Sequence, residues 1–528
     1  MKKNTIFLFV IVLLSVSIGY LFGSKNHIII PLLNPSHPSI DKLNRLMTYL
    51  TRDYVDKINV DSLVRIVIED IVDELDPHSV YIPAIQSESL SESMKGNFEG
   101  IGVQFRMLQD TVAISRVLEG GPSEKAGLLS GDRILMADQD TLFQKQLKSE
   151  QIVSRLKGSS STPVRLTVYR KLQDSIYIFD IIRGPVPLPS INASYMINQS
   201  TGYIKINRFS QTTYDEFKKA INLLVSQEMK NLILDLRGNP GGYLLPAKQI
   251  ADDFLEASKP IVIVEGNNGR REQTVSSNKG LFEKGSLFIL VDEDSASASE
   301  VIAGAIQDND RGLIIGRRTF GKGLVQQQMP LGQGDQVRLT TARYYTPTGR
   351  SIQRPYDSSS RSDYYSEIRK RYQTGEMKDP EKIPLNDSLI FRTPKGRIVY
   401  GGGGITPDIY ISSNENEEEA WNRYLIGSNL IDLFTFLELD KNYKKYKFDN
   451  APRFFNEGLP KPEQFIFAFE EFCKQYNLPI KVTSKNKEII LNSIKAFIAL
   501  QVFNENMYIR IINQTDPFII RAIEEIPI

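Results

Sequence analysis

Apolar strands and amphipathic helices are predicted to alternate along residues 190–412, and this alternation constrains the fold more than any other feature. The strand-like runs include GYIKINRF, NLILDLR, IVIV, SLFILVD and GLIIG, and the helix-like stretches between them include TTYDEFKKAINLLVSQ and LLPAKQIADDFLEA. Such alternation is typical of a mostly parallel sheet covered by helices. The stretch GLVQQQMPLGQGDQVRLTTARYYTP instead predicts a hairpin that turns at residues 332–335. The polar residues 356–388 predict a long surface insertion.

Segments on either side of this alternating region predict further domains. Residues 41–96 carry apolar side chains at helical spacing and predict an N-terminal helical region behind a proline-rich linker, residues 25–40. Short β-rich runs separated by Gly, Pro and Asp turns predict a small β module over residues 97–185. Residues 413–528 contain two helical apolar stripes, which packing explains better than a ligand site does. The predicted fold class is therefore α/β and multidomain, with the α/β core at residues 186–412.

An uncharged, mostly apolar run occupies residues 6–22, behind Lys2 and Lys3. Its length is at the short end of the roughly 17–25 residues that a membrane-spanning helix needs. No clear A-x-A cleavage site follows, so a signal anchor in residues 1–24 is favoured over a cleaved signal peptide. The basic end predicts an inner-membrane anchor with the rest of the chain in the periplasm, and a cleaved signal would release the chain there. The membrane is thus one expected partner.

The composition argues against a nucleic-acid-binding protein, a disulfide-linked protein and a metalloenzyme. The formal net charge of +1 gives no basic field for nucleic acid, so no nucleic-acid partner is expected. Cys473 is the only cysteine, which excludes an intrachain disulfide, and the histidines are confined to His27, His37 and His78. Because the chain has neither a cysteine–histidine cluster nor an HExxH motif, no metal and no other cofactor is expected.

The serine-rich run DSASASE, residues 294–300, stands between the strand SLFILVD and a predicted helix. A helix start presents unpaired backbone N–H groups and a positive dipole end, and both stabilise an oxyanion. Ser297 is therefore a candidate nucleophile, with the N–H of Ala298 beside it. The structural alternative is that Ser297 and Glu300 form an S-x-x-E capping box. Three serines separated by alanines are more than capping needs.

Lys322 lies between two glycines, 25 residues beyond Ser297. Since the histidines lie far away in the sequence, a serine nucleophile here would need another base. A lysine with the usual pKa of about 10.4 is a poor base at neutral pH, but burial without a carboxylate partner would lower that pKa. Gln326 could hold the amine by a hydrogen bond without charging it. A surface lysine in a glycine turn is the alternative, but both features in one α/β domain favour a Ser-Lys hydrolase.

Two glycine loops are further candidate sites. In DLRGNPGGYLL, Gly241 and Gly242 can aim backbone N–H groups at an anion, which in a hydrolase would supply the second half of an oxyanion hole. A phosphate loop competes with this interpretation, but the G-x-x-x-x-G-K-[ST] motif is absent. GIGV, residues 100–103, can take a peptide carboxylate while the adjacent strand edge pairs with an extended chain. Simple turns are the structural alternative for both loops.

These features, in this order, resemble the C-terminal processing peptidases, also called tail-specific proteases. The resemblance covers about residues 41–412 and extends to LDPHSVYI, GGPSEKAGLLSGDRI, LDLRGNPGG, SASASE, TFGKGLVQ, TPTGRSIQ and GGGGITPDI. It implies a serine endopeptidase with a ClpP/crotonase-like core. It also implies a PDZ domain at residues 97–185 that recognises protein substrates by their apolar C-terminal tails.

Carried over residue by residue, the resemblance implies specific roles. The nucleophile is Ser297, the base is Lys322, and Gln326 orients the lysine. The oxyanion donors fall on Gly241 or Gly242 and on Ala298. The peptide would bind along Gly100, Ile101, Gly102 and Val103, with assistance from Arg133. No metal is implied. Residues 413–528 exceed what the minimal enzyme needs, and dimerisation into a homodimer and capping of an active-site tunnel are both open.

Two other functions stay open from the sequence. A membrane-tethered PDZ scaffold on a degenerate protease fold would bind C-termini without cutting, but it has no need of Ser297, Lys322 and Gln326 together. A crotonase-type acyl-CoA enzyme fits the core topology, but it leaves the β module and the N-terminal segment unexplained.

Overall fold

The computed structural model divides the chain into two units, residues 1–71 and 72–528. In the first unit, α2 (Pro38–Arg52) and most of α3 (Val60–Asp73) form the two helices expected there. None of the side chains of α2 is buried. The structure describes residues 38–356, 361–413, 424, 427–442, 450–478, 480–484 and 486–526.

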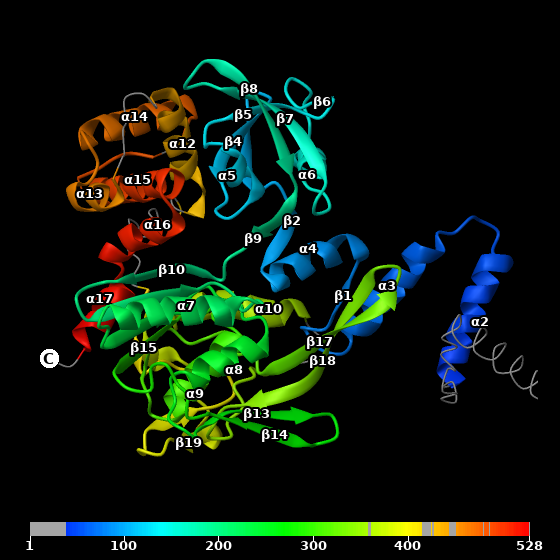
Figure 1. Cartoon of the computed structure of the whole chain (residues 1–528). Coiled ribbons are helices and arrows are strands. Elements are labelled where there is room, and N and C mark those ends of the chain that lie inside the picture. The colour runs from blue at the N-terminus through cyan, green and yellow to red at the C-terminus, as the bar shows by residue number, and fades with distance from the viewer. Residues whose placement is uncertain are drawn as a thin grey trace, which may run out of the picture. The chain divides into compact units, whose positions relative to one another are not determined.

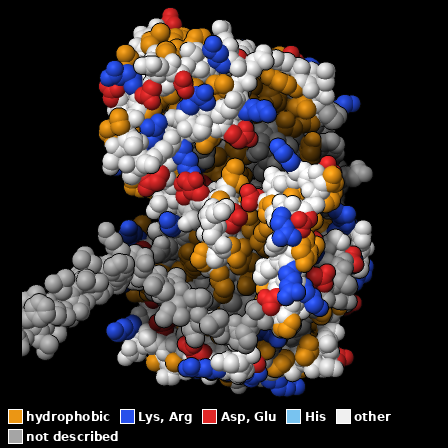
Figure 2. All heavy atoms as spheres, turned by 90° about the vertical axis from the view of Figure 1, so that its right-hand side faces the viewer, with side chains coloured by type: hydrophobic (Ala, Val, Ile, Leu, Met, Phe, Trp, Pro, Cys, Tyr) orange, Lys and Arg blue, Asp and Glu red, His pale blue; other side chains and the backbone are white. Residues whose placement is uncertain are grey.

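No helix of the described residues combines the length and apolar character needed to cross a membrane. The localisation expected from the sequence, an inner-membrane anchor with the rest of the chain in the periplasm, is corrected on this finding. The run on which that expectation rested, residues 6–22, lies outside the described residues. Figure 2 shows basic, acidic and apolar side chains interspersed over the face that it displays.

The predicted β module is an antiparallel sheet with strand order β3-β4-β5-β7-β8, and β6 pairs with β5 (Figure 1). Alternate side chains of its strands, among them Ile114, Ile134 and Leu166, fill one apolar core. A separate pair, β2 with β9, lies where the chain enters and leaves the module. The elements are α4 (Ala84–Lys95), β2 (Asn97–Gly100), β3 (Val103–Leu108), β4 (Thr111–Val117), α5 (Pro122–Ala126), β5 (Arg133–Ala137), β6 (Asp140–Thr141), α6 (Ser149–Leu156), β7 (Pro163–Arg170), β8 (Ser175–Ile182) and β9 (Gly184–Pro187).

The α/β core is built on a six-stranded sheet with order β10-β11-β12-β15-β16-β21. Only the β10–β11 pair is antiparallel, so the expected mostly parallel sheet is confirmed. Alternate residues of these strands pack on opposite faces: Leu234 and Ile289 join the core with α7, α8 and α9, whereas Ile233 and Phe288 pack with α17 (Pro517–Glu524). The elements are β10 (Ile191–Met196), β11 (Thr201–Ile206), α7 (Thr213–Ser226), β12 (Asn231–Asp235), α8 (Leu244–Asp252), β15 (Ser286–Val291), α9 (Ala298–Asp308), β16 (Leu313–Gly316) and β21 (Ile409–Tyr410).

A second, five-stranded sheet contains the predicted hairpin. Strands β17 and β18 pair antiparallel, and Gly332 opposite Asp335 closes the turn where the sequence predicted it. The run IVIV is a strand, β13, but it pairs antiparallel with β18 rather than joining the parallel sheet. The sequence could not reveal that partner, which lies about 80 residues away in the chain. The strands are β1 (Val80–Ile82), β13 (Pro260–Gly266), β14 (Arg271–Val275), β17 (Leu324–Gly332) and β18 (Asp335–Tyr345).

The predicted surface insertion is partly buried. Within it, α10 (Arg361–Thr374) buries Tyr364 and Arg371, which are 5% and 2% exposed. The Arg371 guanidinium bonds the Glu367 carboxylate and the backbone carbonyls of Arg318 and Thr319, and the Tyr364 ring contacts those of His78 and Phe320. This polar segment therefore packs by charged hydrogen bonds as well as by ring contacts. The short elements nearby are η1 (Pro380–Lys382), η2 (Asp387–Leu389), β19 (Ile390–Arg392) and β20 (Ile398–Tyr400).

The C-terminal region is helical, as expected, and the two apolar stripes of the sequence meet in one core. Phe465 and Phe469 from one stripe pack with Ile490 and Ile494 from the other. The packing interpretation of these stripes is therefore confirmed, whereas dimerisation and tunnel capping stay predictions. The elements are α12 (Leu430–Asn442), α13 (Ala451–Glu457), α14 (Pro462–Gln475), α15 (Lys487–Val502), α16 (Glu505–Ile512), η3 (Asn513–Thr515) and α17 (Pro517–Glu524).

Candidate active site

Ser297 stands at the start of α9, just after the turn that follows β15. Its φ of 54° and ψ of −111° are rarely adopted by a residue other than glycine. Strained backbone of this kind is concentrated at functional sites. The two flanking serines are buried, and both hydroxyl groups already donate a hydrogen bond to the backbone. The Ser295 hydroxyl donates to the Leu236 carbonyl (2.9 Å), and the Ser299 hydroxyl donates to the Asn239 carbonyl (3.0 Å). Ser297 is the half-buried one, so the middle serine of the three is the reachable one.

Glu300 is a central residue that the sequence suggested only as half of a capping box. Its fully buried carboxylate accepts from the Ser297 N–H (2.8 Å), as capping requires. It also accepts from the N–H groups of Gly321 (2.7 Å) and Lys322 (2.9 Å) and from the Thr319 hydroxyl (2.5 Å). Burial raises the pKa of Glu300 in spite of these bonds. One carboxylate therefore joins the helix start to the lysine loop.

Lys322 is half-buried, and its Nζ donates to Oε1 of Gln326 at 2.7 Å. Burial lowers the pKa of Lys322 to about 8, and the nearby Arg338 guanidinium acts in the same direction. The carboxylates of Asp76 and Glu300 oppose this lowering without overcoming it. The sequence predicted a lowered pKa for an amine without a carboxylate partner; here the pKa is lowered although two carboxylates act on the amine. At neutral pH a useful fraction of this amine is unprotonated.

The glycine loop lies against Ser297. A Cβ on Gly241 would be 2.8 Å from the Ser297 Cβ and 3.0 Å from the Ala298 nitrogen, so the loop approaches this closely only because Gly241 lacks a side chain. The Gly241 N–H donates to Oδ1 of Asn239 (2.8 Å). Among the described residues, the Gly242 N–H makes no hydrogen bond, so the two glycines are not equivalent as donors.

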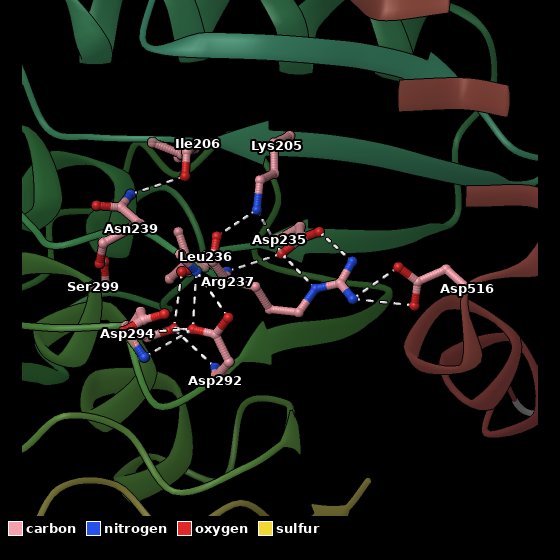
Figure 3. A network of polar contacts seen from close by, with 12 residues as sticks. Lys205, Ile206, Asp235, Leu236, Arg237, Asn239, Asp292, Asp294, Ser299 and Asp516 are labelled. Carbon is pink, nitrogen blue, oxygen red and sulfur yellow. Dashed lines mark hydrogen bonds and ion pairs between the residues drawn. The ribbon is translucent and has the colours of Figure 1, made fainter. Parts of the chain in front are cut away.

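A network of charged side chains lies at the end of β12, from which this loop departs, and includes Lys205, Asp235, Arg237 and Asp516 (Figure 3). Asp235, at the end of β12, accepts from Arg237 (2.6 Å) and Lys205 (3.2 Å). Burial alone would raise the pKa of Asp235, but these two cations outweigh it and hold the pKa well below its usual range. Arg237 also bonds Asp516 at the start of α17 (2.8 Å) and lies over the Phe518 ring (4.5 Å). The C-terminal helix is therefore joined to the strand end from which the glycine loop departs.

Asp292 connects the same loop to the nucleophile side of the site. Its carboxylate accepts from the Gly238 N–H (2.9 Å) and from the Ser295 N–H (3.1 Å). Asp292 follows β15 directly, so the turn before α9 and the glycine loop share a hydrogen-bond acceptor. This arrangement explains why the carboxyl ends of β12 and β15, which are neighbours in the sheet, present the loop and the serine together.

The residues expected to bind a peptide lie in the β module. Gly102 has a φ of 82°, and its carbonyl accepts from the Leu118 N–H (3.0 Å). Arg133, on β5, donates to the Gly131 carbonyl (2.6 Å) and to the carboxylate of Asp440 on α12 (2.7 Å). The peptide-binding roles of Gly100, Ile101, Gly102, Val103 and Arg133 stay predictions.

His78 is a neighbour of the Lys322–Gln326 pair that the sequence did not predict. It is distant in sequence from Lys322, yet its backbone carbonyl accepts from Nε2 of Gln326 at 2.7 Å. Burial lowers the pKa of the His78 ring to about 3, and the charge of Lys322 adds to this effect. The ring is therefore neutral at neutral pH, and its Nε2 lies 2.8 Å from the Tyr364 hydroxyl. The motif LDPHSVYI marked this position without revealing its contacts.

Comparison with known proteins identifies the families that the chain matches. Peptidase family S41 matches residues 200–357, and the PDZ domain family matches residues 100–175. Carboxy-terminal processing protease CtpB of Bacillus subtilis is 31% identical over 363 residues, which cover 67% of this chain and 73% of that protein. The carboxy-terminal-processing protease of Bartonella bacilliformis is 34% identical over 305 residues, covering 57% and 69%.

Among solved structures, the photosystem II D1 C-terminal processing protease matches at 24% identity with a TM-score of 0.37, covering 71% of this chain and 87% of that one. The family assignment rests on the sequence matches, because the relative from Bacillus subtilis exceeds 30% identity over most of its own length. This chain therefore belongs to peptidase family S41, as a carboxy-terminal processing serine protease that carries a PDZ domain.

Proposed function

We propose that this protease cleaves its substrates by a Ser-Lys mechanism in which Ser297 is the nucleophile and Lys322 the general base. Neutral Nζ of Lys322 takes the hydroxyl proton while Oγ of Ser297 attacks the scissile carbonyl carbon. The resulting oxyanion is stabilised by the Ala298 N–H and by the glycine loop, where Gly242 is the better donor because Asn239 already engages the Gly241 N–H.

The remaining steps return every proton. Protonated Lys322 gives its proton to the leaving amine as the C–N bond breaks, which leaves an acyl group on Ser297. Lys322 then takes a proton from water, the hydroxide attacks the acyl carbon, and the proton passes to Oγ as the carboxylic acid departs. Gln326 holds Nζ through its uncharged Oε1 throughout.

The observation that carries this proposal is the lowered pKa of the buried Lys322 amine, together with the attachment of Lys322 and Ser297 to one carboxylate. Its pKa of about 8 leaves roughly a tenth of the amine unprotonated at pH 7. The same buried carboxylate, Glu300, accepts from the backbone of Lys322 and from the backbone of Ser297. A lowered amine pKa beside a strained, reachable serine is what base catalysis by lysine requires.

We further propose that the PDZ domain, residues 97–185, takes the apolar C-terminal tail of a protein substrate along residues 100–103. The tail would add to the edge of β3, which pairs with a strand on one side only. The protease core, residues 186–412, would then receive the extended chain. The matched ranges 100–175 and 200–357 lie inside these bounds.

The test uses the full chain and an unfolded protein that ends in an apolar tail. Wild type is expected to cleave it, whereas Ser297→Ala and Lys322→Ala are each expected to lose at least about a thousandfold in rate. Ser226→Ala and Lys284→Ala change an exposed serine and an exposed lysine of the same core and should cleave normally. Normal turnover by Ser297→Ala would reject the mechanism. Tail binding without cleavage by wild type would instead favour a scaffold.

A further inference from the structure

The segment LDPHSVYI, residues 75–82, has no part in the mechanism above, although it lies against the base. Its second residue, Asp76, closes a buried turn. Oδ1 of Asp76 accepts from the N–H groups of His78 (2.8 Å) and Ser79 (2.9 Å), and Oδ2 accepts from the Ser79 hydroxyl (2.6 Å). Asp76, His78 and Ser79 are all at most 6% exposed. One side chain therefore fixes three donors and the backbone between them.

The turn is attached to the strand that faces Gln326. Thr340 is the Cα partner of Gln326 in the β17–β18 pair, and its N–H donates to the Ser79 hydroxyl (3.1 Å). Strand β1, which follows the turn, pairs with the other edge of β18. Thr340 therefore contacts the turn and also lies opposite Gln326, so one residue of β18 places both.

Helix α10 fixes the turn from the opposite side. The Tyr365 hydroxyl donates to the Pro77 carbonyl (2.9 Å), and the Tyr364 hydroxyl lies 2.8 Å from Nε2 of His78. The rings of Tyr364 and Phe320 pack edge-on around the His78 ring. With the strand on one side and the helix on the other, the His78 carbonyl has one available direction.

That direction decides the orientation of the Gln326 amide. A glutamine amide has a donor end and an acceptor end. Because the His78 carbonyl accepts from Nε2 (2.7 Å), Oε1 faces Nζ of Lys322 (2.7 Å). If the carbonyl moved, the amide could rotate and present its NH2 group to the amine, and a donor there would occupy the lone pair that must take the serine proton.

We propose that Asp76 is a positioning residue for the hydrolytic reaction: it holds the His78 carbonyl, which fixes the Gln326 amide, which orients the Lys322 amine. This inference rests on the proposed function, because it assigns a role relative to Lys322 as the base. The hydrogen bonds of the Asp76 carboxylate go to His78 and Ser79 of the turn, and not to Ser297 or Lys322. Asp76 acts through two intermediates, and the contacts of each intermediate are given above.

Asp76 also has a second, separable effect on Lys322. Burial alone would raise the pKa of Asp76, but its hydrogen bonds lower the pKa below the usual value, so the carboxylate is charged at neutral pH. The charged groups that act on Lys322 are Arg338 from β18, Glu300 from α9 and Asp76 from the turn, while His78 is neutral. Removing the charge of Asp76 should lower the pKa of Lys322 further, which moves the acidic limb of the pH–rate profile to lower pH.

The test compares Asp76→Asn with wild type in the full chain, using the unfolded protein with an apolar tail as substrate. We expect kcat on the alkaline plateau to fall by about tenfold or more, because a misoriented base loses its geometry. KM should be unchanged, since no substrate contact is altered. The acidic limb should move to lower pH. Glu74→Gln is the control: it removes an exposed carboxylate two residues earlier, and it should change neither kcat nor the pH at which the acidic limb of the pH–rate profile falls.

The shift of the limb reports the lost charge, whereas a fall in kcat with KM unchanged reports the lost geometry. Wild-type kcat in Asp76→Asn would therefore overturn the proposal, as would a fall in kcat accompanied by a changed KM. Ser79→Ala keeps the charge and removes one bond of the turn, so kcat should fall with the limb in place. If Asp76→Asn fails to fold, wild-type kcat in Ser79→Ala overturns the proposal. Ser297→Ala and Lys322→Ala are assayed in the same experiment. Cleavage by either of these variants contradicts the proposed mechanism. If both are inactive while Asp76→Asn has wild-type kcat, only the role inferred for Asp76 is contradicted.

Discussion

Ser297 and Lys322 are held at their backbones by the same two side chains. The Glu300 carboxylate accepts from the N–H of both residues, at 2.8 and 2.9 Å. The buried Tyr344 hydroxyl lies 3.0 Å from the Ser297 carbonyl oxygen and 2.8 Å from that of Lys322. Lys322 follows Ser297 by 25 positions in the sequence, and Glu300 and Tyr344 fix the relative placement of the two backbones.

Replacing Glu300 with glutamine should therefore damage activity and stability together. The amide would turn an NH2 donor toward backbone N–H groups, and a buried donor left unpaired costs about 1–3 kcal/mol. We expect a lower melting temperature and a kcat reduced by about a hundredfold. Tyr344→Phe is the matched comparison, since it removes only the hydroxyl and should give a smaller loss of both. A Glu300→Gln enzyme with wild-type kcat would show that the shared carboxylate is dispensable.

The pH–rate profile should report the titration of Lys322. Its amine acts as a base only when neutral, so kcat/KM should rise with pH through about 8 and then level off. Gln326→Glu places a carboxylate beside the amine, which favours the charged form and should move this limb to higher pH. Rates measured from about pH 6 to 10 for both enzymes would test this. A limb at the same pH in both enzymes would indicate that another group titrates.

Gly241→Ala should inactivate the enzyme by steric conflict. The new Cβ would lie 2.7 Å from the Ala296 oxygen and 2.8 Å from the Ser297 Cβ, and the φ of 96° is itself unfavourable for alanine. Gly238→Ala is the matched control, because Gly238 also has a positive φ of 66° but nothing within 4 Å of the added Cβ. We expect Gly238→Ala to cost only about 1 kcal/mol of stability and to keep its activity. Equal kcat values for the two variants would contradict the close approach of the loop to Ser297.

The ion pair between Arg237 and Asp516 should stabilise the fold. Asp516→Asn removes one of the two carboxylates that Arg237 bonds, both of them largely buried, and should lower the free energy of unfolding by about 1–3 kcal/mol. Glu524→Gln, an exposed change at the other end of α17, is the control. Thermal unfolding of both variants would measure the difference. Equal melting temperatures would show that the attachment of α17 depends on its apolar face alone.

The sequence predicts local features of this protein well and distant pairings poorly. The β17–β18 hairpin and the Ser297 helix start follow from short local patterns, and the parallel sheet follows from the alternation of strands and helices over residues 190–412. The antiparallel placement of β13 does not, because its partner β18 is remote in the chain. The contact of His78 with Gln326 is likewise remote, at 248 residues, so counting histidines near Ser297 in sequence missed it. Glu300 was visible as a capping residue, but its bonds to the lysine loop depend on tertiary packing.

The most direct test of the Ser-Lys mechanism is the capture of its covalent intermediate. The full chain, mixed with the tailed substrate and quenched in acid within the first turnover, should carry an acyl adduct on the peptide that contains Ser297. Mass spectrometry should find that adduct in wild type and not in Ser297→Ala or Lys322→Ala. Turnover by wild type with no adduct on Ser297, together with continued cleavage by Ser297→Ala, would contradict the account.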